Sequence, residues 1–399
     1  MKKVLFVCHN LTIGGIQKSL ISLLNAWDGG GNQVYVMTGD LSAPLVEKLP
    51  SYVKIVKTPW QLNAFFFRTH DLSCGFRALW KKPLLFARYL IAVGRVFLKF
   101  DDKDTAKKKF WRKNHKNFGF LKEYYGQFDV AISFVGAWQM WNEFTLDCIG
   151  AKRNLCWVHG DYSKFGIRCA EETETMQRFD RFVCVSKASE QTLLECLPEL
   201  NGKTTVLYNL IDDVAVHAKS TAFSVEQEQA FSIVSVARIS PAKGLDLAVP
   251  AVARLVREGY DLKWRIIGDG DARAVLEKQI EQENMQEHIL LLGAQDNPFP
   301  YVKQADLFLQ PSRNEGRPLA VEEAKCLGCA ILLTDFTSAS EVITNGENGM
   351  IVPLSSDGIY EGLKYLMSHP DVLQSYREQL AGYRSDDSAP QRLTVLLQE

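Results

Sequence analysis

Short apolar runs that alternate with helical patterns constrain the fold of this 399-residue chain more than any other feature. In the N-terminal half they lie at 4–8, 34–37, 53–56, 130–134, 154–158 and 181–185. Segments such as Ile16 to Leu24, with apolar residues at helical spacing, lie between them. The pattern restarts at 232–237 and continues at 263–268, 289–293 and 305–312. Strands interleaved with helices predict an α/β fold with doubly wound parallel sheets, and the restart predicts two such domains.

The length is sufficient for two hydrophobic cores. We expect an N-terminal domain over 1–210, a linker over 211–230, a C-terminal domain over 231–385 and a final helix over 386–399. Hydrophobic residues make up 46% and charged residues 23% of the chain, as in a globular protein, and no apolar run is long enough to span a membrane. The apolar start fits a buried first strand better than a signal peptide. Nine cysteines in apolar runs, Cys326 and Cys329 among them, indicate reduced, packed thiols in a cytosolic protein.

Two carboxylates, Glu315 and Glu323, stand eight positions apart after the run 305–312. Gly316 and Pro318 place the first on a loop, and the second falls on a predicted helix. In open α/β sheets, ligands bind where a strand ends and a helix begins, and a helix N-terminus favours anions. Carboxylates beside an anion site suit the hydroxyls of a sugar or ribose next to a phosphate. A capped surface helix with solvated glutamates is the alternative.

Arg238 and Lys243 flank a proline turn between the predicted strand 232–237 and the next helix. Two fixed positive charges at this position suit a diphosphate and can offset charge on a leaving nucleoside diphosphate. Ordinary surface cations are the alternative. Gly14 and Gly15, after the first strand, allow backbone N–H groups to approach a phosphate, although any tight turn would also use glycine.

His159 follows the run 154–158, at the end of a strand where ligands are expected. We expect it in the active site, donating a hydrogen bond or orienting an acceptor, against the alternative of a structural histidine. Asp269 and Asp271 form an Asp-x-Asp pattern after a predicted strand, which we interpret as turn chemistry and not as a metal site.

The stretch around Glu315 and Glu323 resembles the E-x7-E motif of family 4 glycosyltransferases, which are retaining enzymes of the GT-B fold. The resemblance continues through Gly328 and 331–335 to Glu341 and 345–349 and covers most of the second half of the chain. It implies two Rossmann-like domains that face a central cleft. It also implies that Glu315 approaches the donor sugar, that Glu323 binds the nucleotide ribose, and that Arg238 and Lys243 hold the pyrophosphate. Arg317 and Pro318 depart from the family's more glycine-rich form.

The expected catalytic residues are therefore His159, Glu315, Arg238 and Lys243. The resemblance implies a wider donor-binding set. That set is Gly14, Gly15, Gly268, Asn314, Glu315, Gly316, Arg317, Pro318, Leu319 and Glu323. No metal and no cofactor is expected, since the nucleotide-sugar is a substrate and enzymes of this fold do not generally require a metal.

A basic segment with interleaved aromatic residues is the second informative region. Between Arg77 and Lys122 there are fourteen Lys and Arg against three Asp, a local net charge of +11 in a chain of net charge −1. Cations with aromatic residues suit the surface of anionic lipids. A solvated helical hairpin and nucleic-acid binding are alternatives, of which we expect the latter least. The predicted membrane patch is Lys81, Lys82, Arg88, Arg95, Lys99, Lys107, Lys108, Lys109, Arg112 and Lys113.

The resemblance, together with these patterns, implies a retaining, metal-independent glycosyltransferase that moves a sugar from a nucleotide-sugar, a UDP-sugar, to a hydroxyl of a lipid-linked saccharide. The expected context is cell-surface polysaccharide assembly, in the cytoplasm and on the inner face of the cell membrane, with no nucleic-acid partner. A nucleotide-sugar epimerase or phosphorylase of the same fold is one alternative. A non-catalytic partner subunit of a transferase is another.

Overall fold

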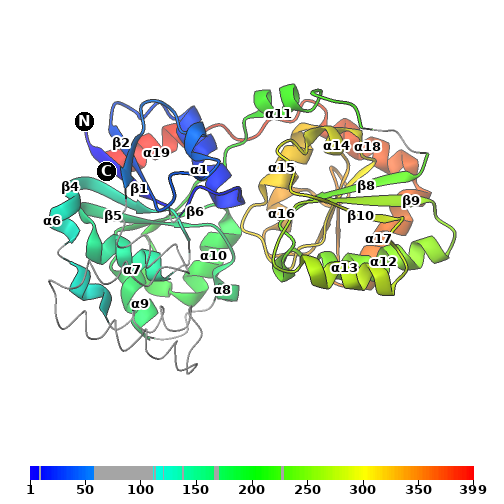
Figure 1. The fold of residues 1–399 in the computed structure, drawn as a ribbon, viewed down its shortest axis with the longest axis horizontal. Coiled ribbons are helices and arrows are strands. Elements are labelled where there is room, and N and C mark those ends of the chain that lie inside the picture. Colours follow the sequence, from blue (N-terminus) through cyan, green and yellow to red (C-terminus); the bar gives the residue numbers. More distant parts are fainter. Residues whose placement is uncertain are drawn as a thin grey trace. The chain divides into compact units, whose positions relative to one another are not determined.

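The computed structural model describes residues 1–8, 10–57, 111, 114–119, 121–136, 139–165, 170–225 and 229–399. These residues form two compact units, each built on a parallel β-sheet (Figure 1). The first unit contains residues 1–185, 190–207 and 390–399, and the second contains 186–189 and 208–389.

The first unit contains a seven-stranded sheet in the order β3-β2-β1-β4-β5-β6-β7, with all its neighbouring strands parallel. The strands are β1 (Lys3–Val7), β2 (Gln33–Thr38), β3 (Lys54–Lys57), β4 (Gln127–Ser133), β5 (Gly150–Val158), β6 (Arg181–Cys184) and β7 (Thr204–Val206). Val4 to Val7 are fully buried because helices cover both faces of a parallel sheet of this kind. The order, which runs outward from β1 in both directions, confirms the predicted doubly wound α/β class.

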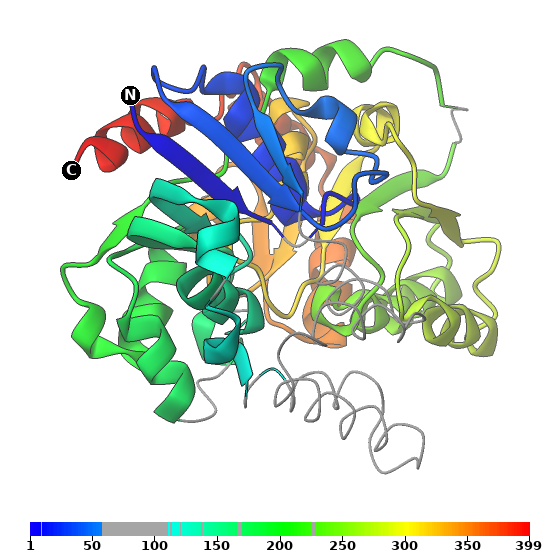
Figure 2. The same ribbon diagram turned by 60° about the vertical axis from the view of Figure 1, so that its left-hand side comes forward.

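In the described part of the first unit, most helices lie between successive strands along the chain. They are α1 (Gly15–Ala26), α6 (Leu121–Tyr125), α7 (Gln139–Cys148), α8 (Tyr162–Phe165), α9 (Ala170–Gln177), α10 (Lys187–Cys196) and the final helix α19 (Ala389–Gln398). Short 3-10 turns lie at Val46–Lys48, His115–Phe118 and Pro198–Leu200. The indole nitrogen of Trp27 donates a hydrogen bond to the Thr394 hydroxyl at 2.9 Å, so α19 packs within the first unit although it lies at the end of the chain (Figure 2).

The second unit contains a six-stranded parallel sheet in the order β10-β9-β8-β11-β12-β13. The strands are β8 (Phe231–Val236), β9 (Leu262–Ile267), β10 (Ile289–Gly293), β11 (Leu307–Gln310), β12 (Ile331–Thr334) and β13 (Met350–Val352). The helices are α11 (Asp213–Lys219), α12 (Leu245–Arg257), α13 (Arg273–Gln282), α14 (Phe299–Gln304), α15 (Leu319–Cys326), α16 (Ala339–Val342), α17 (Ser356–Ser368) and α18 (Pro370–Leu380), with a 3-10 turn at Pro241–Lys243. Two apolar clusters, one around Trp264 and one around Phe308, form its core.

The second unit begins at Tyr208, and the stretch 211–230, expected as a linker, contains helix α11. The Asp212 side chain caps this helix by accepting a hydrogen bond from the Ala215 amide at 2.9 Å. Val216 on its inner face is buried against Phe299 and Cys326. The described residues of this stretch, 211–225 and 229–230, therefore belong to the second unit.

None of the helices in the described part of the chain is both long and apolar enough to cross a membrane.

Candidate functional site

The turn after β8 and the loop after β11 are joined at the carboxyl end of the second unit's sheet. The Arg313 amide donates a hydrogen bond to the Ala242 carbonyl at 2.8 Å. The Arg313 guanidinium binds both carboxylate oxygens of Asp246 at 2.6 Å, which is a bidentate pair. Gly244 adopts a left-handed conformation with φ +62°, and a Cβ at that position would lie 1.9 Å from the Pro311 carbonyl oxygen. Glycine is needed here both for the backbone conformation and for this close approach.

Lys243 and Glu315, predicted separately from the two loops, meet in an ion pair. The Lys243 ammonium lies 2.7 Å from Oε1 and 2.8 Å from Oε2 of Glu315. The Glu315 residue is 8% exposed, so this carboxylate lies in the body of the unit and not in solvent. Ser312 and Gln310 also donate hydrogen bonds to its Oε1, at 2.7 and 2.9 Å. Lys243, which is predicted to bind the pyrophosphate, is therefore in direct contact with Glu315, which is predicted to bind the donor sugar.

Arg238 lies at the same sheet end with a largely exposed side chain, and its Nη2 is 3.3 Å from Oδ1 of Asp271. Asp269 accepts a hydrogen bond from the Gly270 amide at 2.7 Å, as expected for turn chemistry. Gly268 has φ +147°, and a Cβ there would lie 1.9 Å from the Ala237 carbonyl oxygen. The ends of β8 and β9 therefore approach closely beside Arg238.

Glu323 lies on α15, which begins at Leu319 after Pro318 as the N-cap residue. Its side chain is half-buried. The backbone N–H of Asn314 donates a hydrogen bond to the Ala242 carbonyl at 3.4 Å. Gly316 is buried. The predicted strand, loop and helix N-terminus are thus present, and the predicted residues Lys243, Gly268, Asn314, Glu315, Gly316, Pro318, Leu319 and Glu323 all lie in the second unit.

Arg317, expected to contact a donor, instead points into the unit. Its Nη2 lies 2.6 Å from Oε1 of Glu322, and its guanidinium stacks 4.1 Å from the centre of the Tyr208 ring. Glu322 is 1% exposed, and a buried carboxylate requires a counter-charge. The guanidinium therefore has its partners inside the unit in this structure, and the expected donor contact of Arg317 stays a prediction.

Glu322 also binds residues that the sequence did not single out. Its Oε2 accepts a hydrogen bond from the Tyr383 hydroxyl at 2.7 Å and lies 3.2 Å from the Lys325 ammonium. Burial lowers the pKa of Lys325, an effect that Glu322 opposes. A glutamate and a lysine three residues apart on one helix are an ordinary surface pattern, so only the burial identifies this cluster as structural.

Gly14, Gly15 and His159 belong to the first unit. Gly14 is the extended N-cap residue of α1 with φ −165°, and Gly15 begins the helix, so the phosphate contact expected at this turn stays a prediction. His159 lies just after β5, with its ring 4.7 Å from that of Phe134. Burial lowers the pKa of His159 to about 3, against the opposing effect of a hydrogen bond with the Phe134 backbone. Its imidazole is therefore neutral at physiological pH, and its Nε2 is buried with no hydrogen-bond partner among the described residues.

The predicted membrane patch, from Lys81 to Lys113, lies outside the described residues.

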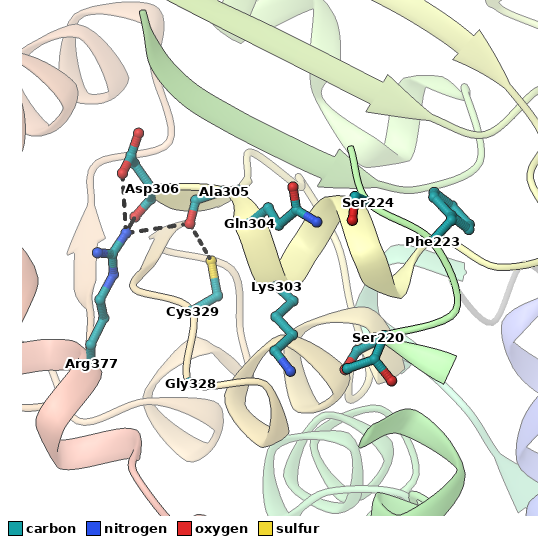
Figure 3. Close-up of a pocket in the computed structure, with 11 residues that line it drawn as sticks. Ser220, Phe223, Ser224, Lys303, Gln304, Ala305, Asp306, Gly328, Cys329 and Arg377 are labelled. Atoms are coloured by element: carbon teal, nitrogen blue, oxygen red, sulfur yellow. Dashed lines mark hydrogen bonds and ion pairs between the residues drawn. The ribbon is translucent and has the colours of Figure 1, made fainter. Parts of the chain in front are cut away.

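A pocket of about 550 Å³ lies at the amino end of β11, whereas Glu315 follows the carboxyl end of that strand. Figure 3 shows residues that line the pocket. There the guanidinium of Arg377 donates hydrogen bonds to the carbonyls of Ala305 and Asp306 at 3.3 and 3.0 Å. Helices α11, α14 and α15 all end beside this pocket, and helix C-termini repel anions. The pocket is therefore a poor phosphate site.

Several known proteins are similar to this chain in sequence. Residues 218–382 match the profile of the family described as "Glycosyl transferases group 1". The N-acetylgalactosamine-N,N'-diacetylbacillosaminyl-diphospho-undecaprenol 4-alpha-N-acetylgalactosaminyltransferase of Campylobacter jejuni is 29% identical over 194 residues, which are 48% of this chain and 52% of that protein. The amylovoran biosynthesis glycosyltransferase AmsK of Erwinia amylovora is 32% identical over 133 residues, which are 31% and 33%. The chain thus spans about half the length of the first curated relative and a third of the second.

In fold, the chain is similar to HepE of Anabaena, solved with UDP and glucose, with a TM-score of 0.68 and 15% identity over the whole of both chains. Two doubly wound sheets of this kind define the GT-B glycosyltransferases, and this chain has the GT-B fold. Residues 218–382, which lie in the second unit, are similar to the glycosyl transferases group 1.

Proposed function

We propose that this protein is a retaining glycosyltransferase that moves a sugar from a UDP-sugar to a hydroxyl of a lipid-linked saccharide during polysaccharide assembly. The contact between Lys243 and Glu315 at the sheet end carries this proposal, because it joins a cation suited to phosphate with a carboxylate suited to sugar hydroxyls. Such a pair lies where open α/β sheets bind their ligands. The UDP found with HepE supports a uridine nucleotide as donor.

In this proposal Arg238 and Lys243 bind the diphosphate, Glu315 binds the donor sugar and Glu323 binds the ribose. The acceptor hydroxyl attacks the anomeric carbon as the bond from that carbon to the diphosphate oxygen breaks. The leaving phosphate oxygen takes the acceptor proton, and the positive charges of Arg238 and Lys243 stabilise the charge that develops on the diphosphate. No metal is needed, because these two side chains supply the charge. Neutral His159 hydrogen-bonds the acceptor or the donor sugar.

The names of the relatives support the proposed acceptor. The Campylobacter jejuni relative is named for transfer to a diphospho-undecaprenol, which is a lipid-linked saccharide. AmsK and the colanic acid glycosyltransferase WcaL of Salmonella typhimurium are named for polysaccharide biosynthesis. The basic, aromatic segment between Arg77 and Lys122 would bind an anionic membrane surface, where such acceptors reside.

Nucleotide binding is the direct test of this proposal. Thermal unfolding should be measured with panels of UDP-, GDP-, CDP- and dTDP-sugars, and a UDP-sugar should raise the transition temperature most. The stabilising donor is then incubated with lipid-linked saccharides, and the anomeric configuration of the product is read by NMR. An inverted product would contradict retention, and sugar-nucleotide conversion without any acceptor would favour an epimerase. Failure of all these nucleotides to bind would indicate a non-catalytic subunit.

A further inference from the structure

The two oxygens of the Glu315 carboxylate have unequal surroundings. Oε1 accepts hydrogen bonds from Lys243, Gln310 and Ser312, at 2.7, 2.9 and 2.7 Å. For Oε2 the structure gives one donor, Lys243, at 2.8 Å. Oε1 therefore has three hydrogen-bond donors, whereas Oε2 depends on the Lys243 ammonium.

The three donors also differ in how deeply they are buried. Gln310 and Ser312 are 2% and 0% exposed, and the Ser312 carbonyl accepts a hydrogen bond from the Thr334 hydroxyl at 2.7 Å. The Gln310 amide donates to the Ser312 hydroxyl at 2.7 Å as well as to Glu315. The Lys243 side chain is 26% exposed and ends a flexible four-carbon stem. Lys243 is thus the donor that can leave without disturbing the core.

We propose that Lys243 exchanges partners when the donor binds. Diphosphate oxygens replace Glu315 around the ammonium, and hydroxyls of the donor sugar replace Lys243 at Oε2. Gln310 and Ser312 act as positioning residues that keep Glu315 in place during the exchange. This inference rests on the proposed function, because it takes the nucleotide-sugar to lie against these residues.

The exchange has a consequence for selectivity between donor and product. A nucleoside diphosphate without sugar takes Lys243 away but offers no hydroxyl to Oε2. It then leaves a buried carboxylate oxygen without a hydrogen bond, which is costly. Glu315 therefore disfavours the bare diphosphate, whereas the intact donor satisfies both groups. This difference promotes release of the nucleotide product after transfer.

UDP alone is a sufficient probe, and its affinity is measured by calorimetry. Glu315→Gln removes the charge that competes for Lys243, so we expect UDP to bind about tenfold tighter, the effect of one charge-assisted hydrogen bond. Lys243→Met should weaken UDP binding. In the Lys243→Met background, Glu315→Gln should give no gain, because the competition acts through the ammonium. Asp335→Asn, an exposed carboxylate after the neighbouring strand β12, controls for a general loss of negative charge.

The positioning role of Gln310 has its own readout. Gln310→Glu places a second carboxylate beside Glu315, and the two carboxylates share a proton as the pH falls. The measured quantity is the UDP affinity of this variant divided by that of wild type at the same pH. This ratio should fall as pH rises, because two ionised carboxylates then hold Lys243. A purely structural role for Gln310 would lower stability without changing this pH profile.

Several results would overturn this inference. An unchanged or reduced UDP affinity in a folded Glu315→Gln variant would overturn it. An equal gain in UDP affinity from Glu315→Gln in the Lys243→Met background would also overturn it. If Glu315→Gln does not fold, Glu315→Met should show the same gain, since it also lacks the charge. Wild-type protein that binds none of UDP, GDP, CDP and dTDP would overturn the proposed function together with the exchange. Wild-type binding without the Glu315 effect would overturn the exchange alone.

Discussion

Gly244 approaches Pro311 so closely that a Cβ on Gly244 would lie 1.9 Å from the Pro311 carbonyl oxygen. The two residues are 67 positions apart, and their contact joins the turn that carries Lys243 to the loop that carries Glu315. The geometry of the candidate site therefore depends on a position with no side chain.

Gly244→Ala should destabilise the protein by about 3 kcal/mol, because it combines left-handed backbone strain with a steric clash. Gly328→Ala is a matched control, since Gly328 has a similar φ of +67° and a Cβ there would meet no described atom within 4 Å. Thermal unfolding followed by circular dichroism measures both variants. An equal loss of stability in the two would mean that the contact with Pro311 can relax.

Glu322→Gln should reduce the free energy of unfolding by roughly 3 kcal/mol at pH 7, because two buried cations lose their counter-charge. Burial already lowers the pKa of Lys325 in the folded state, and loss of Glu322 should lower it further. The unfolded state then binds more protons than the folded state, so stability should rise with pH toward the usual lysine pKa.

Denaturant unfolding at pH 7 and pH 9.5 should therefore show a smaller deficit at the higher pH. Glu361→Gln, on the exposed side of α17, provides the control and should stay within about 0.5 kcal/mol of wild type. A deficit in Glu322→Gln that does not change with pH would exclude Lys325 as its source.

Arg238→Ala should lower turnover by roughly 10²-fold, which is typical for loss of one group that stabilises developing charge. The Arg238 side chain is largely exposed and pairs only loosely with Asp271, so the unfolding temperature should hardly change. Glu323→Ala should weaken donor binding instead. Steady-state kinetics with the identified donor and acceptor would separate these effects, and near-wild-type kinetics in both variants would refute the assignment of the site.

Transfer should persist in excess EDTA, since Arg238 and Lys243 supply the positive charge that a divalent ion supplies elsewhere. Asp269 accepts a hydrogen bond from Gly270, and Asp271 pairs with Arg238, so both carboxylates have other partners. Initial rates with and without the chelator test this. Loss of activity that Mn²⁺ restores would instead make these aspartates metal ligands.

Charge reversal at Lys107, Lys108 and Lys109 should reduce co-sedimentation with anionic liposomes and slow transfer to a lipid-linked acceptor. Salt should weaken the binding of the wild type, while the aromatic residues should retain part of it, because apolar burial is not screened. UDP affinity should stay unchanged, which controls for folding. Equal binding to neutral and anionic liposomes, insensitive to these substitutions, would favour a solvated hairpin.

The sequence alone determined the positions of many strands and the two loops that carry Lys243 and Glu315. Apolar runs predict β1, β8 and β11 because a strand covered on both faces is apolar throughout. The loop with Glu315 and the turn with Lys243 were predicted because glycine, proline and charge occur there in a local pattern. The stretch 211–230 was misjudged as a linker, since the polar residues of a short helix such as α11 hide its single buried face.

Only the tertiary structure decided which charges meet. Lys243 and Glu315 are 72 positions apart, and no local pattern shows that they form an ion pair. In the sequence, Arg317 and Glu322 resemble ordinary surface charges, yet both side chains lie inside the unit. Tyr208 packs against Arg317 and Tyr383 binds Glu322, and both tyrosines come from distant parts of the chain. Burial and pairing depend on long-range packing, which residue order does not reveal, whereas periodicity and turn chemistry are local and can be read directly.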